Sequence, residues 1–372
     1  MKTRVYLIFG GRSGEHEVSL MSARNVLEAI DKSRYEVIPV GITREGRWIR
    51  SGDPLKALLE GVERGGGIPV ALLADPGVRD LVPLASPGDA APGVSAARPS
   101  GDPPAVFFPV LHGTYGEDGT IQGLLEMAGV PYVGCGVLAS AVGMDKAVAK
   151  ALFAQAGLPV VPHRVFLRPR WEREPGLVAA EAEAAFGYPC FVKPANLGSS
   201  VGVSKPKSRS ELEGALAEAF RFDRKVLVEA AVDAREIEVA VLGNDDPVVS
   251  VPGEVVPGRE FYDYEDKYVE DRARLLIPAP LEPAQAEEAR RLALAAYRCI
   301  DGAGMARVDL FLERGSGRFY VNEVNTIPGF TRISMFPKLM EASGIPYPEL
   351  VDRLIQLAIE RWRDRQRNAV TR

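Results

Sequence analysis

The strongest constraint on the fold comes from two apolar segments, residues 306–311 and 319–326, that carry polar residues at alternate positions. Both have the length and composition of β-strands, in which side chains two residues apart share a face. The polar residues are Arg307 and Asp309 on the first segment, and Glu323 and Asn325 on the second. Unpaired charge is unfavourable in an apolar core. Such oxygen ligands suit Mg²⁺ working with nucleotide phosphates, although these segments alone also fit a solvated sheet face with a salt bridge.

Composition argues against several classes of protein. The chain has 372 residues, 46% hydrophobic and 26% charged, which suits two or three globular domains. A net charge of −5 without a long basic run argues against nucleic-acid binding. Three cysteines without C-x-x-C spacing argue against disulfides and zinc and favour a reducing cytoplasm. No apolar stretch approaches a membrane span, and the run at residues 5–9 is too short for a signal-peptide core.

The N-terminal part has the pattern of a parallel sheet. A strand at residues 4–9 runs into a glycine turn at 10–14, a helix follows near 19–30, and a second strand spans 36–42. This order defines a βαβ unit. The turn reads G-G-x-x-G instead of the dinucleotide fingerprint G-x-G-x-x-G, and no Walker A sequence occurs, so a Rossmann dehydrogenase fits poorly.

The rest of the pattern predicts two further units. Residues 61–104 are rich in Gly, Pro and Ala with little periodicity, and we interpret them as a surface excursion of the first unit. The second unit contains strands at 190–193 and 201–204, joined by a glycine- and serine-rich loop. The fold class is α/β, with α+β character in the later units. The expected domains are residues 1–140, 141–232 and 233–372.

Four further charged residues are candidates for chemistry. Lys193 ends a strand before the glycine- and serine-rich loop, whose N–H groups and hydroxyls can bind phosphate oxygens. A plain hairpin with a surface lysine fits this segment equally well. Glu229 ends an apolar strand and Glu236 follows seven residues later, so either acid could bind ribose hydroxyls. Each acid on its own also fits an exposed carboxylate, and Lys146 at a helix start fits an ordinary surface residue.

Together these segments occur in the order found in ATP-grasp enzymes. They are MDK at 144–146, VKP at 192–194, GSSVG at 198–202, FYDYEDKY at 261–268, RVD at 307–309 and NEVNTIPG at 322–329. With GGRSGEHEVS at 10–19, LHG at 111–113 and GEDGTIQG at 116–123, the chain closely resembles the D-alanine–D-alanine ligase family. The resemblance runs from residue 5 to the C-terminal helix and leaves out only residues 61–104.

The resemblance implies a three-domain ATP-grasp fold with ATP between the second and third domains. By motif position, Glu229 lies at the adenine hinge and Glu236 binds the ribose. Some relatives carry a lysine and a bulky aromatic after the hinge glutamate, whereas this chain has Ala230 and Ala231, which leaves the adenine contacts open. The implied ligands of two Mg²⁺ or Mn²⁺ ions are Asp309, Glu323 and Asn325. The implied phosphate contacts are Lys146, Lys193, Gly198, Ser199, Ser200 and, from a closing loop, Lys267.

The implied reaction is ATP + 2 D-alanine → D-alanyl-D-alanine + ADP + phosphate, through an acylphosphate. Arg307 and the backbone N–H of Gly329 are expected to stabilise the tetrahedral oxyanion. Glu15 is expected to hold the ammonium of the first D-alanine and to link by hydrogen bonds to Ser199 and Tyr268. The residues implied to line the substrate pockets are His112 for the first D-alanine, and Ser334 and Met335 for the second.

Two other functions compete with this interpretation. One is an ATP-grasp ligase that uses D-lactate or a different amino acid, against which Tyr268 argues, because depsipeptide-forming relatives carry another residue there. The other is a nucleotide-binding regulatory protein without turnover, against which the full set of metal and phosphate residues argues. The resemblance further implies a cytoplasmic homodimer that makes peptidoglycan precursors, with neither nucleic acid nor membrane as a partner.

Overall fold

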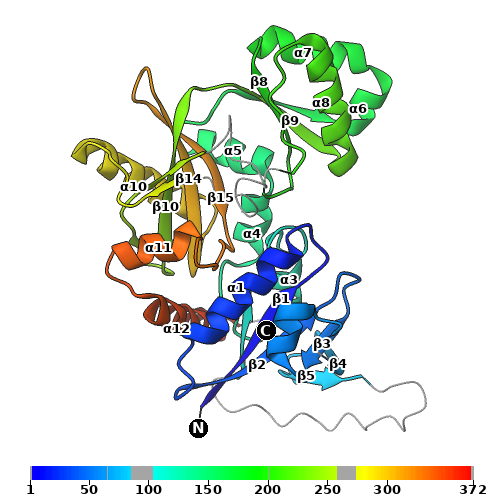
Figure 1. The fold of residues 1–372 in the computed structure, drawn as a ribbon, viewed down its shortest axis with the longest axis vertical. Helices are drawn as coiled ribbons and strands as arrows, with labels where there is room; N and C mark the ends of the chain where they lie inside the picture. Colours follow the sequence, from blue (N-terminus) through cyan, green and yellow to red (C-terminus); the bar gives the residue numbers. More distant parts are fainter. Residues whose placement is uncertain (1, 65, 85–103, 200, 258–273, 370–372) are drawn as a thin grey trace.

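Three β-sheets with their helices make up this computed structural model, which describes residues 2–64, 66–84, 104–199, 201–257 and 274–369 (Figure 1). Two of the sheets have six strands and one has three. The class is mixed α/β, as the sequence predicts. None of the helices in the described ranges combines the length and the apolar character needed to cross a membrane.

The first sheet is built on a parallel βαβ unit at the N-terminus. Its strands are β1 (Thr3–Gly10), β2 (Tyr35–Ile42), β3 (Trp48–Ser51), β4 (Gly67–Leu72), β5 (Leu81–Pro83) and β6 (Val106–Pro109). Its helices are α1 (His16–Ala29), α2 (Pro54–Glu60) and α3 (Thr120–Met127). Strand β1 pairs in parallel with both β2 and β6, which confirms the predicted βαβ unit. The strand order is β5-β4-β3-β2-β1-β6, and the pairs β2–β3, β3–β4 and β4–β5 are antiparallel.

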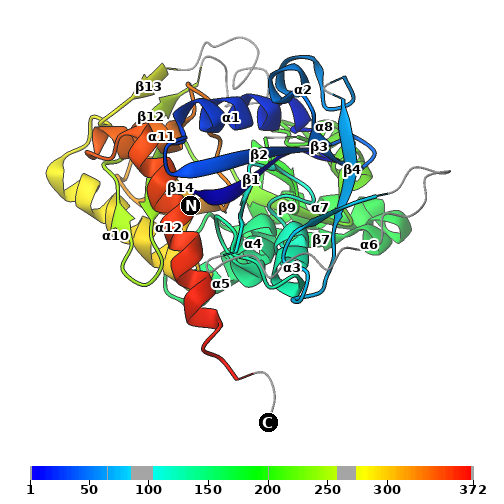
Figure 2. The same cartoon turned by 90° about the horizontal axis from the view of Figure 1, so that it is seen from below.

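Both faces of the first sheet are covered, which explains the continuous apolar run of β1. Val5, Leu7 and Phe9 lie in the core formed with α1 and α2, whereas Tyr6 and Ile8 lie in the core formed with α3. Figure 2 shows α1 and α2 on one side of this sheet and α3 on the other. A strand buried on both faces has an uninterrupted hydrophobic sequence instead of an alternating one.

Two expectations about extended segments need correction. Residues 61–104 contain β4 and β5, which extend the first sheet, so this segment is more than a surface excursion. Val70 and Leu72 are buried on one face of β4, and pairing with β3 outweighs the local Gly and Pro content. At 201–204 no strand forms, and only an isolated bridge joins Ser204 to Val192, because the chain turns at Gly202 with φ of 71°.

The second sheet is small and antiparallel, and it carries the strand that ends near Lys193. Its strands are β7 (His163–Leu167), β8 (Cys190–Pro194) and β9 (Lys225–Ala230), in the order β7-β9-β8. Its helices are α6 (Arg168–Arg173), α7 (Pro175–Phe186) and α8 (Arg209–Phe222). One face packs its apolar residues against α7 and α8. The other face turns toward the third sheet, since Lys193 Nζ lies 5.8 Å from the centre of the Phe311 ring.

The third sheet has one apolar face and one divided face. Its strands are β10 (Ala234–Leu242), β11 (Val248–Val249), β12 (Gly253–Val256), β13 (Arg274–Leu276), β14 (Met305–Glu313) and β15 (Phe319–Asn325). The helices around it are α4 (Val137–Met144), α5 (Lys146–Gln155), α10 (Pro283–Cys299), α11 (Met335–Ala342) and α12 (Tyr347–Arg365). Val239 and Val308 pack with α4, α5 and α10. On the opposite face, Leu242 and Met305 pack with α11 and α12, while Glu238, Arg307 and Asp309 lie further along that face.

The three sheets relate simply to the expected domain ranges. The strands of the first sheet lie within residues 1–140, those of the second within 141–232 and those of the third within 233–372. The exact boundaries of these ranges stay predictions. Helix α5, which the sequence assigns to the second range, instead shares its core with the third sheet. Helix α12 shares a core with β1 and α1, so the first and third units are joined by continuous apolar packing.

Candidate active site

The polar residues expected on one strand face do share that face. In the antiparallel pair β14–β15, Arg307 lies opposite Asn325, and Asp309 lies opposite Glu323. Directly opposite residues point to the same side of a sheet. On β10, Glu238 also lies opposite Asp309 and adds a third carboxylate, which sequence reasoning missed as a site residue. The sequence could have indicated Glu238, because it lies two residues after Glu236 in an alternating strand and therefore shares its face.

A β-bulge interrupts this strand pair next to the carboxylates. Asp309 pairs with Glu323 but Leu310 pairs with Val321, so Asn322 is the extra residue. The register shift keeps Val321 in the apolar core. It also brings Asn322 Oδ1 to 3.5 Å from Lys193 Nζ, across the gap between the third and second sheets. The bulge therefore links the carboxylate face to the lysine of the second sheet.

Arg307 is fixed by carboxylates on two strands. Its Nε and Nη2 atoms donate to the two oxygens of Asp309 at 2.7 Å each, and Nε lies 3.0 Å from Glu238 Oε2. Asn325 Nδ2 donates to Asp309 Oδ2 at 3.0 Å. Burial lowers the pKa of Arg307, but Asp309 and Glu238 raise it well above its ordinary value. The guanidinium is thus a permanent, oriented positive charge, which suits stabilisation of an oxyanion.

The expected metal ligands lie together and have the right chemistry for a hard cation. Asp309 and Glu323 supply carboxylates on adjacent strands, and Asn325 supplies an amide. Within the described ranges, no group of three or more His, Cys, Asp or Glu side chains could hold an ion together. Mg²⁺ bound with nucleotide phosphates uses only one or two carboxylates and keeps several waters. The residues present therefore fit Mg²⁺ bound as a nucleotide complex.

Lys146 connects the glycine- and serine-rich loop to the carboxylate face. It is the first residue of α5, whose N-cap Asp145 accepts hydrogen bonds from two backbone N–H groups of the first turn at 3.1 Å. The Lys146 ammonium donates to the carbonyl of Leu197 at 2.7 Å and lies 3.2 Å from Glu323 Oε2. A capped helix start thus places a cation between the loop and a candidate metal ligand.

Glu229 lies between two lysines and is not an exposed carboxylate. Its Oε2 atom is 2.8 Å from Lys193 Nζ, and its Oε1 atom is 3.2 Å from the Nζ of Lys150. Burial raises the pKa of Glu229, but Lys150 and Lys193 bring it down to about 2. Sequence reasoning did not select Lys150. Its spacing of four from Lys146, one helical turn, was the available signal.

The glycine- and serine-rich loop closes on Glu15 of the first unit. The Ser199 hydroxyl donates a hydrogen bond to Glu15 Oε1, and Ser199 holds a left-handed φ of 48°, which costs about 1 kcal/mol or more. A Cβ atom at Gly198 or Gly113 would lie 2.9 or 2.6 Å from Glu15 Oε2. Side chains at both glycines would therefore displace the carboxylate. The Ser199–Glu15 hydrogen bond is the one that the family resemblance implies, while the role of the loop toward phosphate stays a prediction.

His112 is held by the protein through both ring nitrogens. Nδ1 lies 3.0 Å from the carbonyl oxygen of Ile327, and Nε2 lies 2.9 Å from the Ser22 hydroxyl. A carbonyl only accepts, so Nδ1 carries the proton and Nε2 accepts from Ser22. Burial lowers the pKa of His112, which keeps the ring neutral. His112 therefore fixes the loop after β15, and its substrate contact stays a prediction.

Glu117, which sequence reasoning missed, joins the same two loops. It accepts the N–H of Gly113 at 2.7 Å and the N–H of Ile327 at 3.3 Å. Burial raises the pKa of Glu117 to about 8, and the nearby Glu15 carboxylate adds to the rise. A carboxyl group in the first unit thus ties the loop at Gly113 to the loop at Ile327 in the third unit.

The predicted second-substrate residues surround the start of α11. The Ser334 hydroxyl accepts the N–H of Thr331 at 3.0 Å. A Cβ at Gly329 would lie 2.6 Å from Ser334 Oγ, so the approach requires glycine. Met335 is 4% exposed and its side chain belongs to the core, not to an open pocket. Its backbone N–H opens α11, whose N-terminus has no side-chain cap, and such helix ends suit a carboxylate.

Some predicted residues remain untested by this geometry. Glu236 is half-buried on the same face of β10 as Glu238, and lies opposite Phe311. Ser200, Lys267 and Tyr268 lie outside the described residues. Their predicted roles on the phosphates and at Glu15 therefore stay predictions.

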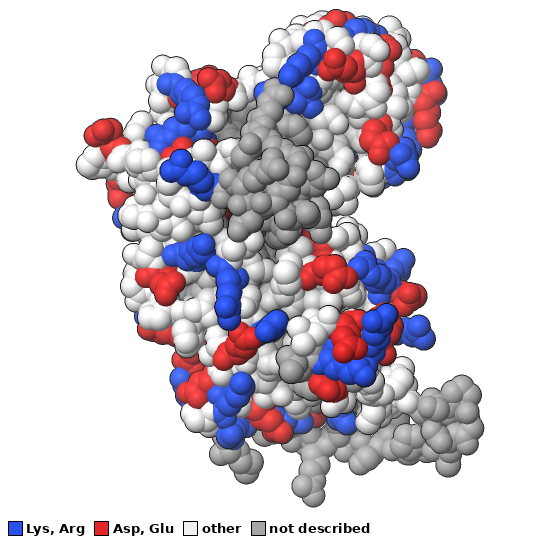
Figure 3. Space-filling model, viewed as in Figure 1, with Lys and Arg blue, Asp and Glu red and all other residues white. Residues whose placement is uncertain are grey.

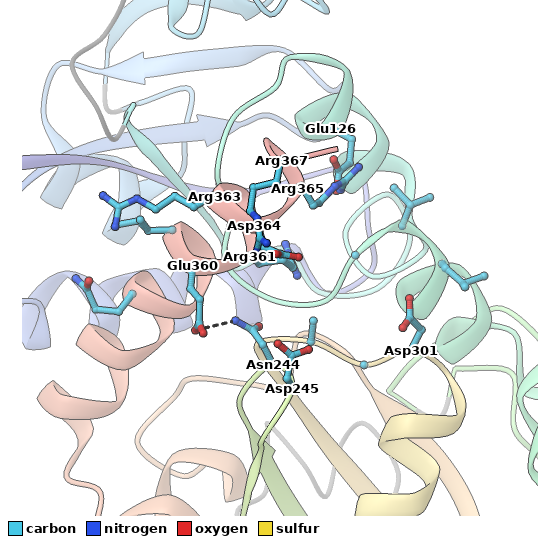
Figure 4. A pocket seen from close by; sticks show the side chains of 17 residues that line it. Glu126, Asn244, Asp245, Asp301, Glu360, Arg361, Arg363, Asp364, Arg365 and Arg367 are labelled. Atoms are coloured by element: carbon cyan, nitrogen blue, oxygen red, sulfur yellow. Dashed lines mark hydrogen bonds and ion pairs between the residues drawn. The ribbon is translucent and has the colours of Figure 1, made fainter. Parts of the chain in front are cut away.

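One cavity of the described structure adjoins the predicted site residues, and another lies away from them. One of about 280 Å³ adjoins Gly10, Gly11 and His112. A larger cavity of about 1080 Å³ lies between α12 and the turn after β10 (Figure 4). Its polar groups pair with one another, for example Asn244 with Glu360 at 3.1 Å, and no predicted site residue lines it. Figure 3 shows acidic and basic side chains interspersed over the visible face.

Comparison with known proteins covers nearly the whole chain. The family descriptions "D-ala D-ala ligase N-terminus" and "D-ala D-ala ligase C-terminus" match residues 4–135 and 152–356. The D-alanine–D-alanine ligase of Heliobacterium modesticaldum is 52% identical over 100% of this chain and 99% of its own length. That of Geobacillus thermodenitrificans is 50% identical over 98% of each chain.

Two solved structures share the fold. A D-Ala:D-Ser ligase from Enterococcus faecalis matches with a TM-score of 0.83 and 35% identity, covering 96% of this chain and 100% of its own. The D-alanine–D-alanine ligase from Coxiella burnetii matches with a TM-score of 0.80 and 34% identity, covering 98% and 97%. The three sheets and the match to these two ligases define a multi-domain ATP-grasp ligase fold. Within that class, the chain belongs to the D-alanine–D-alanine ligase family.

Proposed function

We propose that this chain joins two D-alanines into D-alanyl-D-alanine, with conversion of ATP to ADP and phosphate, as a step in making peptidoglycan precursors. Full-length identity near one half with curated ligases of this activity supports the proposal. The structural observation that carries it is the enclosure of the Glu15 carboxylate by Ser199, Gly198 and Gly113. This arrangement sets an anion suited to an amino acid's ammonium beside a loop suited to phosphate.

The two amino acids would occupy opposite sides of the reacting centre. Glu15 would hold the ammonium of the first D-alanine, whose carboxylate then points toward the phosphate loop. The second D-alanine would place its own carboxylate at Ser334 and the backbone N–H of Met335, where α11 begins. His112 would shape the first pocket by fixing its wall, since both ring nitrogens already have protein partners.

The first chemical step would activate the carboxylate of the first D-alanine. One carboxylate oxygen attacks the γ-phosphorus, the bond to the β,γ-bridging oxygen breaks, and ADP leaves with that oxygen. Lys146 and Lys193 would offset the charge that gathers as carboxylate meets phosphate. Mg²⁺ held by Asp309, Glu323 and Asn325 would supply further charge neutralisation on the phosphates. Glu229 and Glu236 would bind the adenine and ribose of the nucleotide.

The second step would form the peptide bond. The free amine of the second D-alanine attacks the acyl carbon, and the charge moves onto the former carbonyl oxygen. Arg307 and the N–H of Gly329 would stabilise this oxyanion, and the fixed guanidinium supports that role. The bond to the phosphate oxygen then breaks, and phosphate leaves while the amine gives up its proton. Water must be excluded, because it would hydrolyse the acylphosphate.

Further features of the proposal rest on the family resemblance. We propose two Mg²⁺ or Mn²⁺ ions per active site, a homodimer, and action in the cytoplasm. Light scattering coupled to size-exclusion chromatography tests the dimer directly. One chain weighs 40.2 kDa, so a measured mass equal to that of a single chain would contradict the dimer.

A panel of second substrates tests the choice of amino acid. The enzyme is supplied with ATP, Mg²⁺ and D-alanine, alone or with D-serine, D-lactate or L-alanine, and each product is identified by mass. We expect D-alanyl-D-alanine to dominate at neutral pH in every mixture. The match to a D-Ala:D-Ser ligase makes D-serine the informative competitor. A dominant D-alanyl-D-serine or depsipeptide product would replace the proposed activity with that of a related ligase.

A further inference from the structure

A lysine outside the predicted site is buried against one of its carboxylates. Lys150 lies in the second turn of α5 and is fully buried, with its Nζ 3.2 Å from Glu229 Oε1. The second oxygen of Glu229 is 2.8 Å from Lys193 Nζ. One buried carboxylate therefore lies within ion-pair distance of two lysine side chains.

The two lysines differ in what else they can reach. Lys193 lies at the gap between the second and third sheets, where its Nζ is 3.5 Å from Asn322 Oδ1. Lys150 points into the interior, and its Nζ has no aligned hydrogen-bond partner among the described residues beyond its ion pair with Glu229. Packing alone would be satisfied by leucine or methionine, and lysine is seldom buried without a charge to balance. The position of Lys150 therefore reflects the charge of Glu229.

Nucleotide binding would disturb this balance. In the proposed function Lys193 contacts ATP phosphates, and a shift of its ammonium toward them would weaken its ion pair with Glu229. A buried carboxylate that loses its partner is strongly unfavourable. Burial lowers the pKa of Lys150, Glu229 opposes this shift, and the nearby Lys193 ammonium adds to the lowering. Departure of Lys193 would remove that repulsion, and Lys150, whose Nζ lies 3.2 Å from Glu229 Oε1, is the cation that would stay beside Glu229.

We propose that Lys150 is the permanent counter-ion of Glu229, which holds this carboxylate charged and in place while Lys193 moves its ammonium from Glu229 to the ATP phosphates. Lys150 is a positioning residue in this mechanism, because it contacts no substrate. The inference rests on the proposed ATP site but not on which amino acids are ligated. Nucleotide binding alone can therefore test it.

The test is a double-mutant cycle on nucleotide affinity. Calorimetry measures the dissociation constant of a Mg²⁺-bound, non-hydrolysable ATP analogue for the wild type, Lys150→Met, Glu229→Gln and the double variant. Methionine keeps much of the side-chain volume and removes the charge. We expect Lys150→Met to weaken binding about tenfold or more in the wild type, and to have no further effect beside Glu229→Gln, where the carboxylate charge that Lys150 balances is absent. In turnover, KM for ATP should rise while kcat at saturating ATP is largely kept.

A matched control removes a partly buried ion pair away from the proposed nucleotide site. Arg4 Nη1 lies 2.8 Å from Asp80 Oδ2 in the first unit. Arg4→Met should leave the dissociation constant within about twofold of the wild type. A tenfold loss in this control as well would mean that loss of any partly buried ion pair has the same effect, which would overturn the proposal.

Two further results would overturn the inference. One is wild-type affinity in Lys150→Met, and the other is an equal loss in both Glu229 backgrounds, which would mean that Lys150 acts through packing. Should Lys150→Met fail to fold, the double variant carries the test, since it removes both members of the Lys150–Glu229 pair, and it must bind the analogue as Glu229→Gln does. A different outcome is that the double-mutant cycle gives the expected affinities while the wild type shows no D-alanine-dependent turnover. That pair of results would overturn the proposed function and leave the inference about Lys150 standing.

Discussion

The Ser199 hydroxyl donates a hydrogen bond to the Glu15 carboxylate, although the two residues are 184 positions apart in the chain. Ser199 belongs to the loop after β8 in the second unit, whereas Glu15 is the N-cap residue of α1 in the first. The proposed phosphate loop and the proposed ammonium site are therefore joined by one contact. Placement of the loop and formation of the first-substrate pocket should be coupled.

Ser199→Ala should impair binding of the first D-alanine more than binding of ATP. A hydrogen bond to a charged group contributes about 1.5–3 kcal/mol, so KM for D-alanine should rise about tenfold or more. Steady-state phosphate release against D-alanine concentration measures this, with Ser210→Ala on the exposed side of α8 as the control. An unchanged dependence on D-alanine would show that Glu15 acts without this contact.

Asp309→Asn should raise the Mg²⁺ requirement of the reaction. The amide keeps the shape of the side chain but removes the charge that suits a hard cation, so the Mg²⁺ concentration at half-maximal rate should increase about tenfold or more. A Mg²⁺ titration at fixed ATP provides the measurement. Glu313→Gln, at the far end of β14, serves as the matched control. Identical titration curves for Asp309→Asn and the wild type would remove Asp309 from the metal site.

Glu117 should make the fold less stable as pH rises through the neutral range. Its pKa is raised by burial from 4.5 to about 8, so the folded protein binds more protons than the unfolded chain between these values. Stability is therefore greatest below about pH 5 for this group and falls as pH approaches 8, by about 1.4 kcal/mol for each pKa unit of difference.

Glu117→Gln should flatten that dependence, because glutamine does not titrate. Urea unfolding at a series of pH values from about 5 to 9 measures the free energy of unfolding and its slope. Glu341→Gln, at an exposed position of α11, is the control. A slope that survives in Glu117→Gln would assign the effect to another group.

Leu354→Ala should destabilise the junction between the first and third units. Leu354 is 1% exposed in the core that α12 shares with β1 and α1, and truncation of such a leucine costs about 2–5 kcal/mol. The neighbouring residue Arg353 forms an exposed ion pair with Glu349. Arg353→Ala removes this pair and should cost about 1 kcal/mol or less. Chemical denaturation of both variants makes the comparison, and equal losses would mean that the core does not continue through α12.

Alternating strands were predictable because their pattern directly reflects which side chains are buried. Val308 lies in the apolar core on one face of β14, while its neighbours Arg307 and Asp309 pair with each other on the opposite face, as the sequence alternation requires. The strands within residues 61–104 were not predictable in the same way. Val70 is buried there in the core that the first sheet shares with α3, and these long-range contacts leave no local signal.

Within the candidate site, the order of the motifs predicted which residues lie at the site, but it did not predict whether each side chain is buried or exposed. Met335 matches a substrate-binding position, yet its side chain lies in the core. Lys150 and Glu117 escaped notice because a lone charged residue in a helix or loop normally faces solvent. Their burial depends on packing between units that are far apart in the chain. Such residues become visible only when the units are assembled.

Transfer of oxygen tests the central claim, activation of a D-alanine carboxylate by phosphorylation, most directly. D-Alanine labelled with ¹⁸O in its carboxylate is ligated with unlabelled ATP, and the released phosphate is analysed by mass spectrometry. One labelled oxygen should appear in phosphate for each dipeptide formed, because the attacking carboxylate oxygen leaves with phosphate when the peptide bond forms. D-Alanyl-D-alanine formed with unlabelled phosphate would contradict the acylphosphate mechanism.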